Sequence, residues 1–332
     1  MFSTIYVERQ LLHHPRVEQI LQRFAQLPVI PIARYGEIFN RKGQNFRLQK
    51  QNPALILAEK HDRLVLPAPD SYGLGGDHNF YFSHMLNCIY DCRYCFLQGM
   101  YRSAHYLLFI NYDDFYREIG ETVDRHAGES CYFYSGYDCD SLALEPVTRF
   151  VDSFLPLFER YPQAILELRT KSTQIRTLRE RTPLDNVIVA FSFTPENVSK
   201  QLEHKVPSLE RRIEAINKLQ QQGWKIGLRF DPLIYEDGYA EHYRQLFDQL
   251  FSHIDPCALH SVSLGVFRLP ETFYRNMQKL YPNEKLFAAR MTQRNGMKSY
   301  SGELEQAMIS HCETLLFEYI PRHTYFPCSL EQ

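Results

Sequence analysis

Six short apolar runs alternate with helical patterns along the middle of the chain. The runs occupy residues 80–82, 131–134, 165–168, 187–193, 226–230 and 262–266. The helical patterns occupy residues 112–123, 147–158, 208–222 and 242–251. Strands that alternate with helices form a parallel sheet. Each helix returns the chain to the end of the sheet at which the previous strand began, so the next strand runs in the same direction. Six such units predict an α/β fold, a partial (β/α)6 barrel of the TIM type, with its functional face at the carboxyl ends of the strands.

Two regions flank this barrel, which we place at residues 78–270. Residues 1–77 combine a helical pattern that includes Val17 and Ile20 with an apolar run at 55–57, which predicts an N-terminal α/β cap region. Residues 271–332 are predicted to form a short C-terminal extension. No internal repeat and no Pro- or Ser-rich linker separates the three parts.

The composition is that of a packed globular protein. Apolar residues make up 44% of the chain and charged residues 23%, which excludes a disordered chain. Lys and Arg (37) nearly balance Asp and Glu (39), which argues against a strongly basic nucleic-acid binder. No apolar run reaches the roughly 18 residues of a membrane helix, and the first residues lack the pattern of a signal peptide. We therefore expect a cytoplasmic protein with no membrane partner, in which cysteines act as metal ligands, catalytic thiols or buried side chains rather than disulfides.

Three cysteines stand close together just after the first apolar run. Cys88, Cys92 and Cys95 have the spacing C-x3-C-x2-C. Three thiolates can hold three irons of a 4Fe-4S cluster and leave the fourth iron without a protein ligand. The amino and carboxylate groups of S-adenosylmethionine (SAM) can chelate such an open iron, and reductive cleavage then gives a 5'-deoxyadenosyl radical.

Two other interpretations of the triplet stay open at this point. One is a structural zinc site with His84 or Asp91 as the fourth ligand, and the other is a chance group of buried thiols. Zinc sites usually pair two C-x2-C motifs, and no second pair occurs in the chain. The histidines, including His13 and His14, show no ligand spacing.

At the cysteine triplet the sequence resembles the radical SAM superfamily. The run Cys-Phe-Leu-Gln at 95–98, with segments at 5–8, 189–192, 223–227 and 279–286, is similar to the spore photoproduct lyase family, whose members reverse a thymine-thymine ultraviolet lesion in DNA. The resemblance implies a radical SAM barrel that uses a 4Fe-4S cluster and SAM to repair a DNA photolesion as a carbon-carbon lyase. It also implies DNA as a partner and an external electron donor such as a flavodoxin or ferredoxin.

The resemblance also implies roles for individual residues. Lys171 and Ser192 match family positions that contact SAM. The family returns a hydrogen atom to the product radical from a cysteine after the second strand, where this chain has Tyr137, and Cys139 follows two residues later. The family has a Tyr-Cys-Tyr arrangement at the last cluster cysteine, and here the sequence is Tyr94-Cys95-Phe96.

The catalytic candidates are therefore Cys139, Tyr94 and Tyr137. Cys139 is interpreted as a hydrogen-atom donor, a residue that contacts the cofactor, or a buried loop thiol. Gly136 would permit the loop path that brings this thiol to the site.

A basic stretch near the C-terminus is the candidate DNA contact. It contains Arg290, Arg294 and Lys298, followed by Tyr300, whose ring is expected to stack on a base. The alternative is a solvated basic face, which is also the interpretation we give to the pair Arg211 and Arg212. Two further functions stay open: a radical SAM enzyme with another substrate, and a non-catalytic, metal-stabilised nucleic-acid-binding protein.

Overall fold

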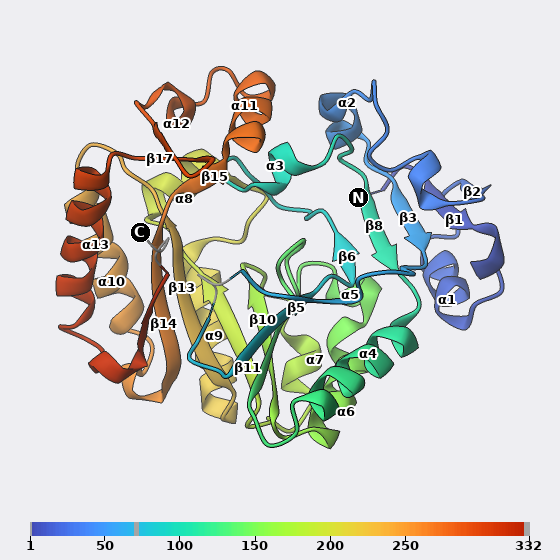
Figure 1. Ribbon diagram of the computed structural model, residues 1–332, viewed down its shortest axis with the longest axis horizontal. Coiled ribbons are helices and arrows are strands. Elements are labelled where there is room, and N and C mark those ends of the chain that lie inside the picture. Colours follow the sequence, from blue (N-terminus) through green and yellow to red (C-terminus); the bar gives the residue numbers. More distant parts are fainter. Residues whose placement is uncertain (1, 70–72, 329–332) are drawn as a thin grey trace.

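A curled sheet of eight strands forms the centre of the computed structural model, which describes residues 2–69 and 73–328 (Figure 1). From one edge to the other the strands are β18 (Tyr325–Pro327), β14 (Leu259–Val266), β13 (Lys225–Leu233), β11 (Val187–Ser192), β10 (Ala164–Thr170), β9 (Cys131–Tyr134), β5 (His78–Phe82) and β4 (Val65–Pro67). All neighbours pair in parallel except β4, which runs antiparallel to β5. Within residues 2–69 and 73–328, the two end strands of this sheet do not pair with each other, so the barrel is partial.

The six predicted apolar runs are confirmed as the six central strands. Every residue of β11 is buried, as expected for a parallel strand that is covered on both faces. The edge strand β18 was placed within the C-terminal extension, but it pairs with β14 and extends the barrel sheet. Three residues are too short to give a periodic signal, so this pairing could not be derived from the sequence.

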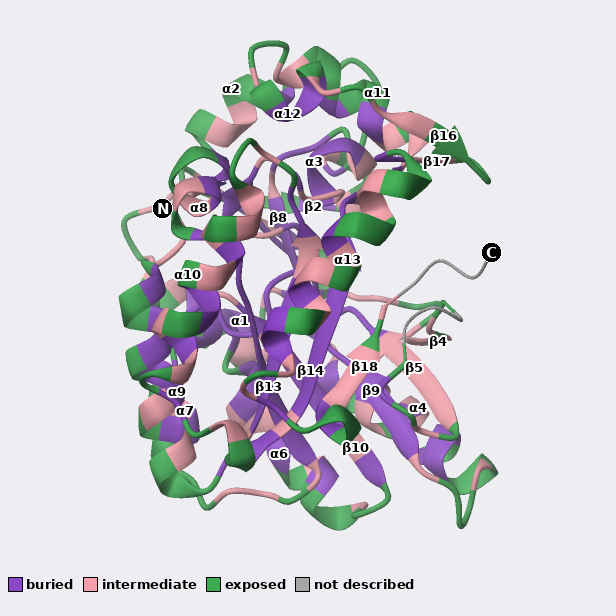
Figure 2. Ribbon diagram, turned by 90° about the vertical axis from the view of Figure 1, so that its left-hand side faces the viewer, coloured by how far each residue is buried: buried purple, intermediate pink, exposed green. Residues whose placement is uncertain are grey.

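Helices pack against the outer face of the sheet and turn their buried sides toward it (Figures 1 and 2). They are α4 (Tyr112–Arg125), α6 (Phe150–Arg160), α7 (Arg176–Arg179), α8 (Glu196–Leu202), α9 (Leu209–Gln222), α10 (Tyr239–Phe251) and α13 (Gly302–Leu316). In α9 the Ser208 side chain accepts the N–H of Arg211 at the start, and Gly223 ends the helix with a φ of 95°. The four predicted helical segments are thus helical, with one interruption.

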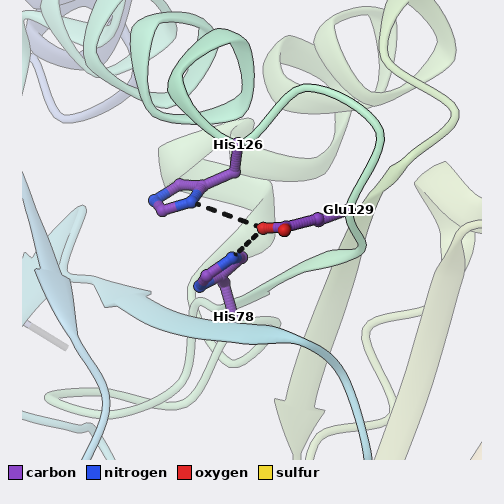
Figure 3. Close-up of side chains that lie close together, drawn as sticks. All are labelled: His78, His126 and Glu129. Carbon is purple, nitrogen blue, oxygen red and sulfur yellow. Dashed lines mark hydrogen bonds and ion pairs between the residues drawn. The ribbon is translucent and has the colours of Figure 1, made fainter.

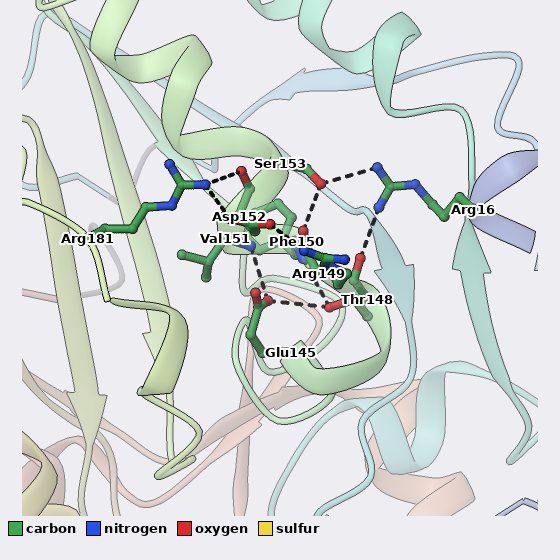
Figure 4. Close-up of polar contacts among 9 residues, drawn as sticks. All are labelled: Arg16, Glu145, Thr148, Arg149, Phe150, Val151, Asp152, Ser153 and Arg181. Atoms are coloured by element: carbon green, nitrogen blue, oxygen red, sulfur yellow. Dashed lines mark hydrogen bonds and ion pairs between the residues drawn. The ribbon is translucent and has the colours of Figure 1, made fainter. Parts of the chain in front are cut away.

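The interruption divides the predicted helix at 147–158. The short helix α5 (Glu145–Thr148) ends at Arg149, which has a φ of 46°, and α6 begins at the next residue. The Glu145 carboxylate accepts the N–H of Val151 at 3.1 Å, in the first turn of α6 (Figure 4). Arg16 donates to the last carbonyl oxygen of α5 at 3.0 Å. This junction therefore ties the N-terminal region to the barrel.

Replacing Glu145 by Gln is expected to alter how stability depends on pH. Burial raises the pKa of Glu145 from 4.5 to about 7. The stability that its protonated form contributes is therefore complete below pH 4.5 and is lost as the pH rises through 7. Glu145→Gln stays neutral at every pH. As the pH rises from 6 to 8, the wild type should therefore lose about 1 kcal/mol of its free energy of unfolding that the variant keeps. Anaerobic urea unfolding at both pH values measures this shift, and parallel pH profiles would contradict the assignment.

A second sheet is built largely from the N-terminal segment. Its order is β2 (Val29–Ile32), β1 (Ile5–Glu8), β3 (Leu55–Ala58), β8 (Tyr106–Phe109) and β6 (Met85–Leu86), with α1 (Pro15–Arg23) and α2 (Phe46–Gln51) in the same region. The predicted helix and the apolar run at 55–57 are thus α1 and β3. The sheet also takes β6 and β8 from beyond residue 77, and the domain division at that residue stays a prediction.

The C-terminal segment lies above the carboxyl ends of the barrel strands (Figure 1). It contains α11 (Glu271–Leu280), α12 (Lys285–Ala288) and a three-stranded sheet of β15 (Arg268–Pro270), β17 (Met297–Ser299) and β16 (Thr292–Arg294). The short helix α3 (Leu97–Met100) packs closely on α11, where Asn276 donates to the Gly99 carbonyl oxygen at 3.0 Å. A Cβ atom at Gly99 would lie 2.4 Å from the Phe273 carbonyl oxygen, so only glycine permits this approach. Across 2–69 and 73–328, no helix has the length and apolar content needed to cross a membrane.

Candidate functional site

A cavity of about 520 Å³ opens at the carboxyl ends of the barrel strands. Its wall includes the last residues of β9, β10 and β11 and the loop between β6 and α3. The α11 segment and β17 contribute the opposite side. This is the face on which a partial barrel carries its chemistry, as predicted.

The predicted cluster cysteines share this cavity. Cys88, Cys92 and Cys95 all line it, with Cys92 buried and the other two half-buried. Burial raises the pKa of all three thiols, so they become metal-binding thiolates only when a cation offsets that cost.

The arrangement of the sulfur atoms bears on two of the interpretations of the triplet. Ligands of one tetrahedral zinc have sulfur atoms about 3.8 Å apart. Among the residues that the structure describes, the three thiols do not form a group whose ligand atoms all lie within 4.8 Å of one another. A four-iron cube spreads its ligands more widely than a single ion, so the donor set fits a 4Fe-4S cluster with one iron free of protein ligands.

The cluster loop is fixed by a short bridge to the segment after α8. The strand β7 (Asp91–Cys92) pairs antiparallel with β12 (Glu203–His204), and Cys92 lies opposite Glu203. The Arg93 N–H also donates to the Leu202 carbonyl oxygen at 2.8 Å. Backbone hydrogen bonds thus hold the middle of the loop in place before any metal binds.

Glu203 is the centre of a buried polar network under the loop. Its carboxylate accepts hydrogen bonds from Tyr94 and from Arg212 at 3.2 Å, and the ammonium group of Lys171 lies 3.7 Å away. Burial opposes the charge of Glu203, but Arg212 and Lys171 hold its pKa at about 2. The carboxylate is therefore ionised, and it orients the Tyr94 hydroxyl and the Lys171 ammonium together.

The network corrects one expectation. Arg212 is not solvated: its side chain is fully buried and pairs with Glu203, whereas Arg211 is exposed. The helical pattern of α9 puts Arg212 on the inward face beside Ile213 and Ile216, and the buried Glu203 carboxylate, nine residues earlier in β12, makes that placement possible.

The predicted SAM contacts lie at adjacent strand ends. Lys171 follows β10, and Ser192 is the last residue of β11. Both line the cavity. The Lys171 N–H donates at 2.6 Å to Asp140, whose carboxylate also accepts the Thr170 hydroxyl at 2.7 Å. Asp140 thereby fixes the backbone from which Lys171 projects.

Tyr137 and Cys139 lie on the wall formed by the loop after β9. Cys139 is 6% exposed, and its Sγ atom donates to the Ser135 carbonyl oxygen at 3.7 Å. The Tyr137 ring packs 4.4 Å from the Tyr81 ring and 5.5 Å from the Phe96 ring. The loop passes close to β10 because its residue 136 is glycine, where a Cβ atom would lie 2.8 Å from that of Arg169. All three catalytic candidates, including Tyr94, therefore line one cavity.

The basic stretch is not assembled as expected. Arg290 and Arg294 are exposed and Lys298 is half-buried, and Arg294 pairs with Glu305. Tyr300 is only 1% exposed, and its hydroxyl accepts the Tyr235 N–H at 3.0 Å. Its ring packs inside the protein, so the expectation that Tyr300 stacks on a base is wrong.

Four charged residues that line the cavity, Glu167, Arg169, Asp231 and Arg268, were not singled out from the sequence. Glu167 and Arg229 form a buried ion pair at 2.7 Å, and Asp231 lies 3.6 Å from Arg169 and 3.7 Å from Arg268. Glu167 and Asp231 follow apolar residues within strands. A single charge beside apolar strand residues was the available signal, but only the sheet brings the partners together.

Comparisons with known proteins identify the family. The family model described as "Spore photoproduct lyase" matches residues 78–322. The spore photoproduct lyase of Bacillus subtilis (strain 168) is 22% identical over 289 residues, which are 85% of this chain and 83% of that protein. The enzyme of Clostridium acetobutylicum is 21% identical over 290 residues, which are 86% of this chain and 84% of that protein.

Solved structures show the same fold. A mutant spore photoproduct lyase with bound AdoMet and dinucleoside spore photoproduct has a TM-score of 0.87 at 17% identity, over 100% of this chain and 99% of that chain. A second, complexed with dinucleoside spore photoproduct, has a TM-score of 0.84 at 16% identity over the same shares. Since the family model spans most of the sequence, including the cysteine loop and the barrel, the chain belongs to the spore photoproduct lyase family.

Proposed function

We propose that this chain is a radical SAM enzyme that repairs the spore photoproduct, the thymine lesion bound in structures of its relatives. The observation that carries the proposal is the shared cavity, which joins the three thiols to Lys171 and Ser192. Its volume of about 520 Å³ lies within the range of small-molecule and cofactor sites.

The residues that line the cavity have separate roles in this proposal. Cys88, Cys92 and Cys95 would hold the cluster. When bound, the cluster and SAM would supply a 5'-deoxyadenosyl radical, the chemistry needed to remove a hydrogen atom from the lesion. The Lys171 ammonium suits the SAM carboxylate, and the Ser192 hydroxyl suits a polar group of the same ligand. The aromatic side chains of the cavity wall enclose the ligands and limit which hydrogen atoms a radical can reach.

Cys139 and Tyr137 are our candidates for returning a hydrogen atom to the product. A thiol gives up a hydrogen atom readily, and Cys139 lines the cavity as a thiol, because burial raises its pKa well above the usual value. The phenol of Tyr137 stands on the same wall, and Phe96 beside it has no hydroxyl to extend a relay. Tyr94 is tied to Glu203, so we assign it a positioning role on the cluster loop.

Replacing Cys139 by Ala tests this assignment. We expect SAM cleavage to continue, while repaired dinucleoside falls by about tenfold or more and side products of the unquenched radical accumulate. Chromatography of the products gives the ratio of repaired dinucleoside to 5'-deoxyadenosine. An unchanged ratio with clean product would remove Cys139 from the mechanism and leave Tyr137.

Lys171→Met tests the SAM site. Loss of one charge-assisted hydrogen bond should raise the KM for SAM by about tenfold to a hundredfold. Arg212 keeps Glu203 paired in this variant, so the loop should stay in place. The matched control is Lys200→Met, an exposed lysine on α8. The rate of 5'-deoxyadenosine formation against SAM concentration measures the KM, and equal values in both variants would contradict the role of Lys171.

DNA, the electron donor and the location complete the proposal. The exposed Arg290 and Arg294, with the half-buried Lys298, suit contact with a phosphate backbone at the edge of the cavity that Met297 lines. A flavodoxin or ferredoxin is the proposed electron donor. The cytoplasm, which keeps thiols reduced, is the proposed location.

Anaerobic turnover on dinucleoside spore photoproduct tests the function as a whole. The proposal expects 5'-deoxyadenosine and repaired dinucleoside to appear together after reconstitution with iron, sulfide and SAM. A second candidate is a radical SAM enzyme with another substrate, which the packing of Tyr137 on Phe96 favours at the position of the family's thiol. Formation of 5'-deoxyadenosine without repair would support the second candidate and overturn the first.

A further inference from the structure

Two imidazoles and a carboxylate meet at the amino end of the barrel strands, at the end opposite to the cavity. His78 begins β5, His126 follows α4, and Glu129 stands in the turn before β9 (Figure 3). His78 Nε2 contacts Glu129 Oε2, and His126 Nδ1 lies 3.8 Å from the same oxygen. The two imidazole rings lie 3.7 Å apart. One ligand atom from each residue lies within 4.8 Å of the others.

The backbone holds these three side chains in register. The Glu129 N–H donates to the His126 carbonyl oxygen at 3.0 Å, and the intervening Gly128 has a φ of 91°. The turn is joined to β5 because the His78 N–H donates to the Ser130 carbonyl oxygen at 3.1 Å. The Asp77 carboxylate accepts both the N–H and the hydroxyl of Ser130 at 2.8 Å. These hydrogen bonds therefore order the backbone before any ligand binds.

The donor set matches a borderline divalent cation. Two imidazole nitrogens and one carboxylate oxygen are the ligands of three-residue zinc sites, which leave the fourth position to water. Such donors stand about 3.3 Å apart around zinc, so coordination requires the side chains to rotate and the two imidazole rings, whose centroids are 3.7 Å apart, to separate. The side chains of His78, His126 and Glu129 are 31%, 29% and 54% exposed, so an ion has an open approach.

We propose that His78, His126 and Glu129 bind one Zn²⁺ ion, which fastens the start of β5 to the turn between α4 and β9. Without metal, the carboxylate and the imidazoles make only partly exposed polar contacts, which contribute little stability. Coordination would lock two segments that are adjacent in the sheet but distant in the sequence. The site is separate from the cluster cavity and independent of the proposed repair activity.

Zinc titration of the full chain tests the proposal. The cluster is reconstituted first, so that its thiols are occupied, and zinc is then titrated in competition with a chromophoric chelator. We expect one zinc per chain, bound at least about tenfold more weakly in His126→Ala and in Glu129→Gln. The matched control His253→Ala removes an exposed imidazole elsewhere and should bind as the wild type does. Zinc should also raise the Tm of the wild type and of His253→Ala, and it should leave the Tm of His126→Ala and of Glu129→Gln unchanged.

Cobalt distinguishes this site from the cysteines if the cluster fails to form. Cobalt held by imidazole and carboxylate shows weak d–d bands, whereas thiolate ligands add strong charge-transfer absorption. The proposal expects His126→Ala to lose the d–d bands of this site and to keep any thiolate charge-transfer absorption. Equal zinc affinity in all variants, or no zinc binding by the wild type at all, would overturn it and leave an ion pair.

Discussion

Cys92→Ala is expected to abolish SAM cleavage, lowering the rate of 5'-deoxyadenosine formation by more than about 1,000-fold. Cys92 lies in the middle of the cluster loop and is paired through its backbone with Glu203. Its loss would leave two thiols at the cavity, which are too few to hold the cluster with a single open iron.

The assay is anaerobic SAM cleavage with a chemical reductant, followed by quantification of 5'-deoxyadenosine. The matched control is Cys257→Ala, which removes an exposed thiol outside the cavity and should keep wild-type activity. If Cys92→Ala retained a tenth of the wild-type rate or more, the thiol would not be a cluster ligand.

Arg212→Met is expected to lower the free energy of unfolding by about 3–5 kcal/mol. The substitution leaves the fully buried Glu203 carboxylate without its main counter-charge, and Lys171 at 3.7 Å is the remaining cation. The stability that Arg212 gives Glu203 is present at neutral pH, because the pKa of Glu203 is held at about 2, and it is lost as the pH falls through that value.

Two further variants make this prediction specific. Arg211→Met changes the exposed neighbour and should alter stability by less than about 0.5 kcal/mol. Glu203→Gln added to Arg212→Met should recover more than half of the loss, since the buried carboxylate that lost its main counter-charge is then replaced by a neutral group. Anaerobic urea unfolding followed by circular dichroism measures all three. A loss in Arg212→Met no larger than that in Arg211→Met would contradict the role of the ion pair.

The barrel and the cluster loop were accessible from the sequence because their signals are local. Each central strand is a nearly continuous apolar run, and three cysteines within eight residues restrict the loop to very few chemistries. Lys171 and Ser192 came from the family resemblance, and the sheet places both at the cavity.

The remaining features depend on contacts between distant segments. The partners of Glu203 are Tyr94, Lys171 and Arg212, which come from three different parts of the chain. Arg212 and Tyr300 were expected on the surface because each stands among polar residues, and the packing of α9 and of the residue that follows β17 buries them. The pairing of β18 with β14 and of β8 with β3 joins segments more than 40 residues apart, which periodicity alone does not reveal.

The central claim is that three thiols hold a four-iron cluster at the mouth of the barrel. Iron and acid-labile sulfide, measured per chain after anaerobic reconstitution, test it most directly. The account predicts about four of each per chain in a brown protein. A colourless protein that carries one zinc ion and no sulfide on these cysteines would contradict it.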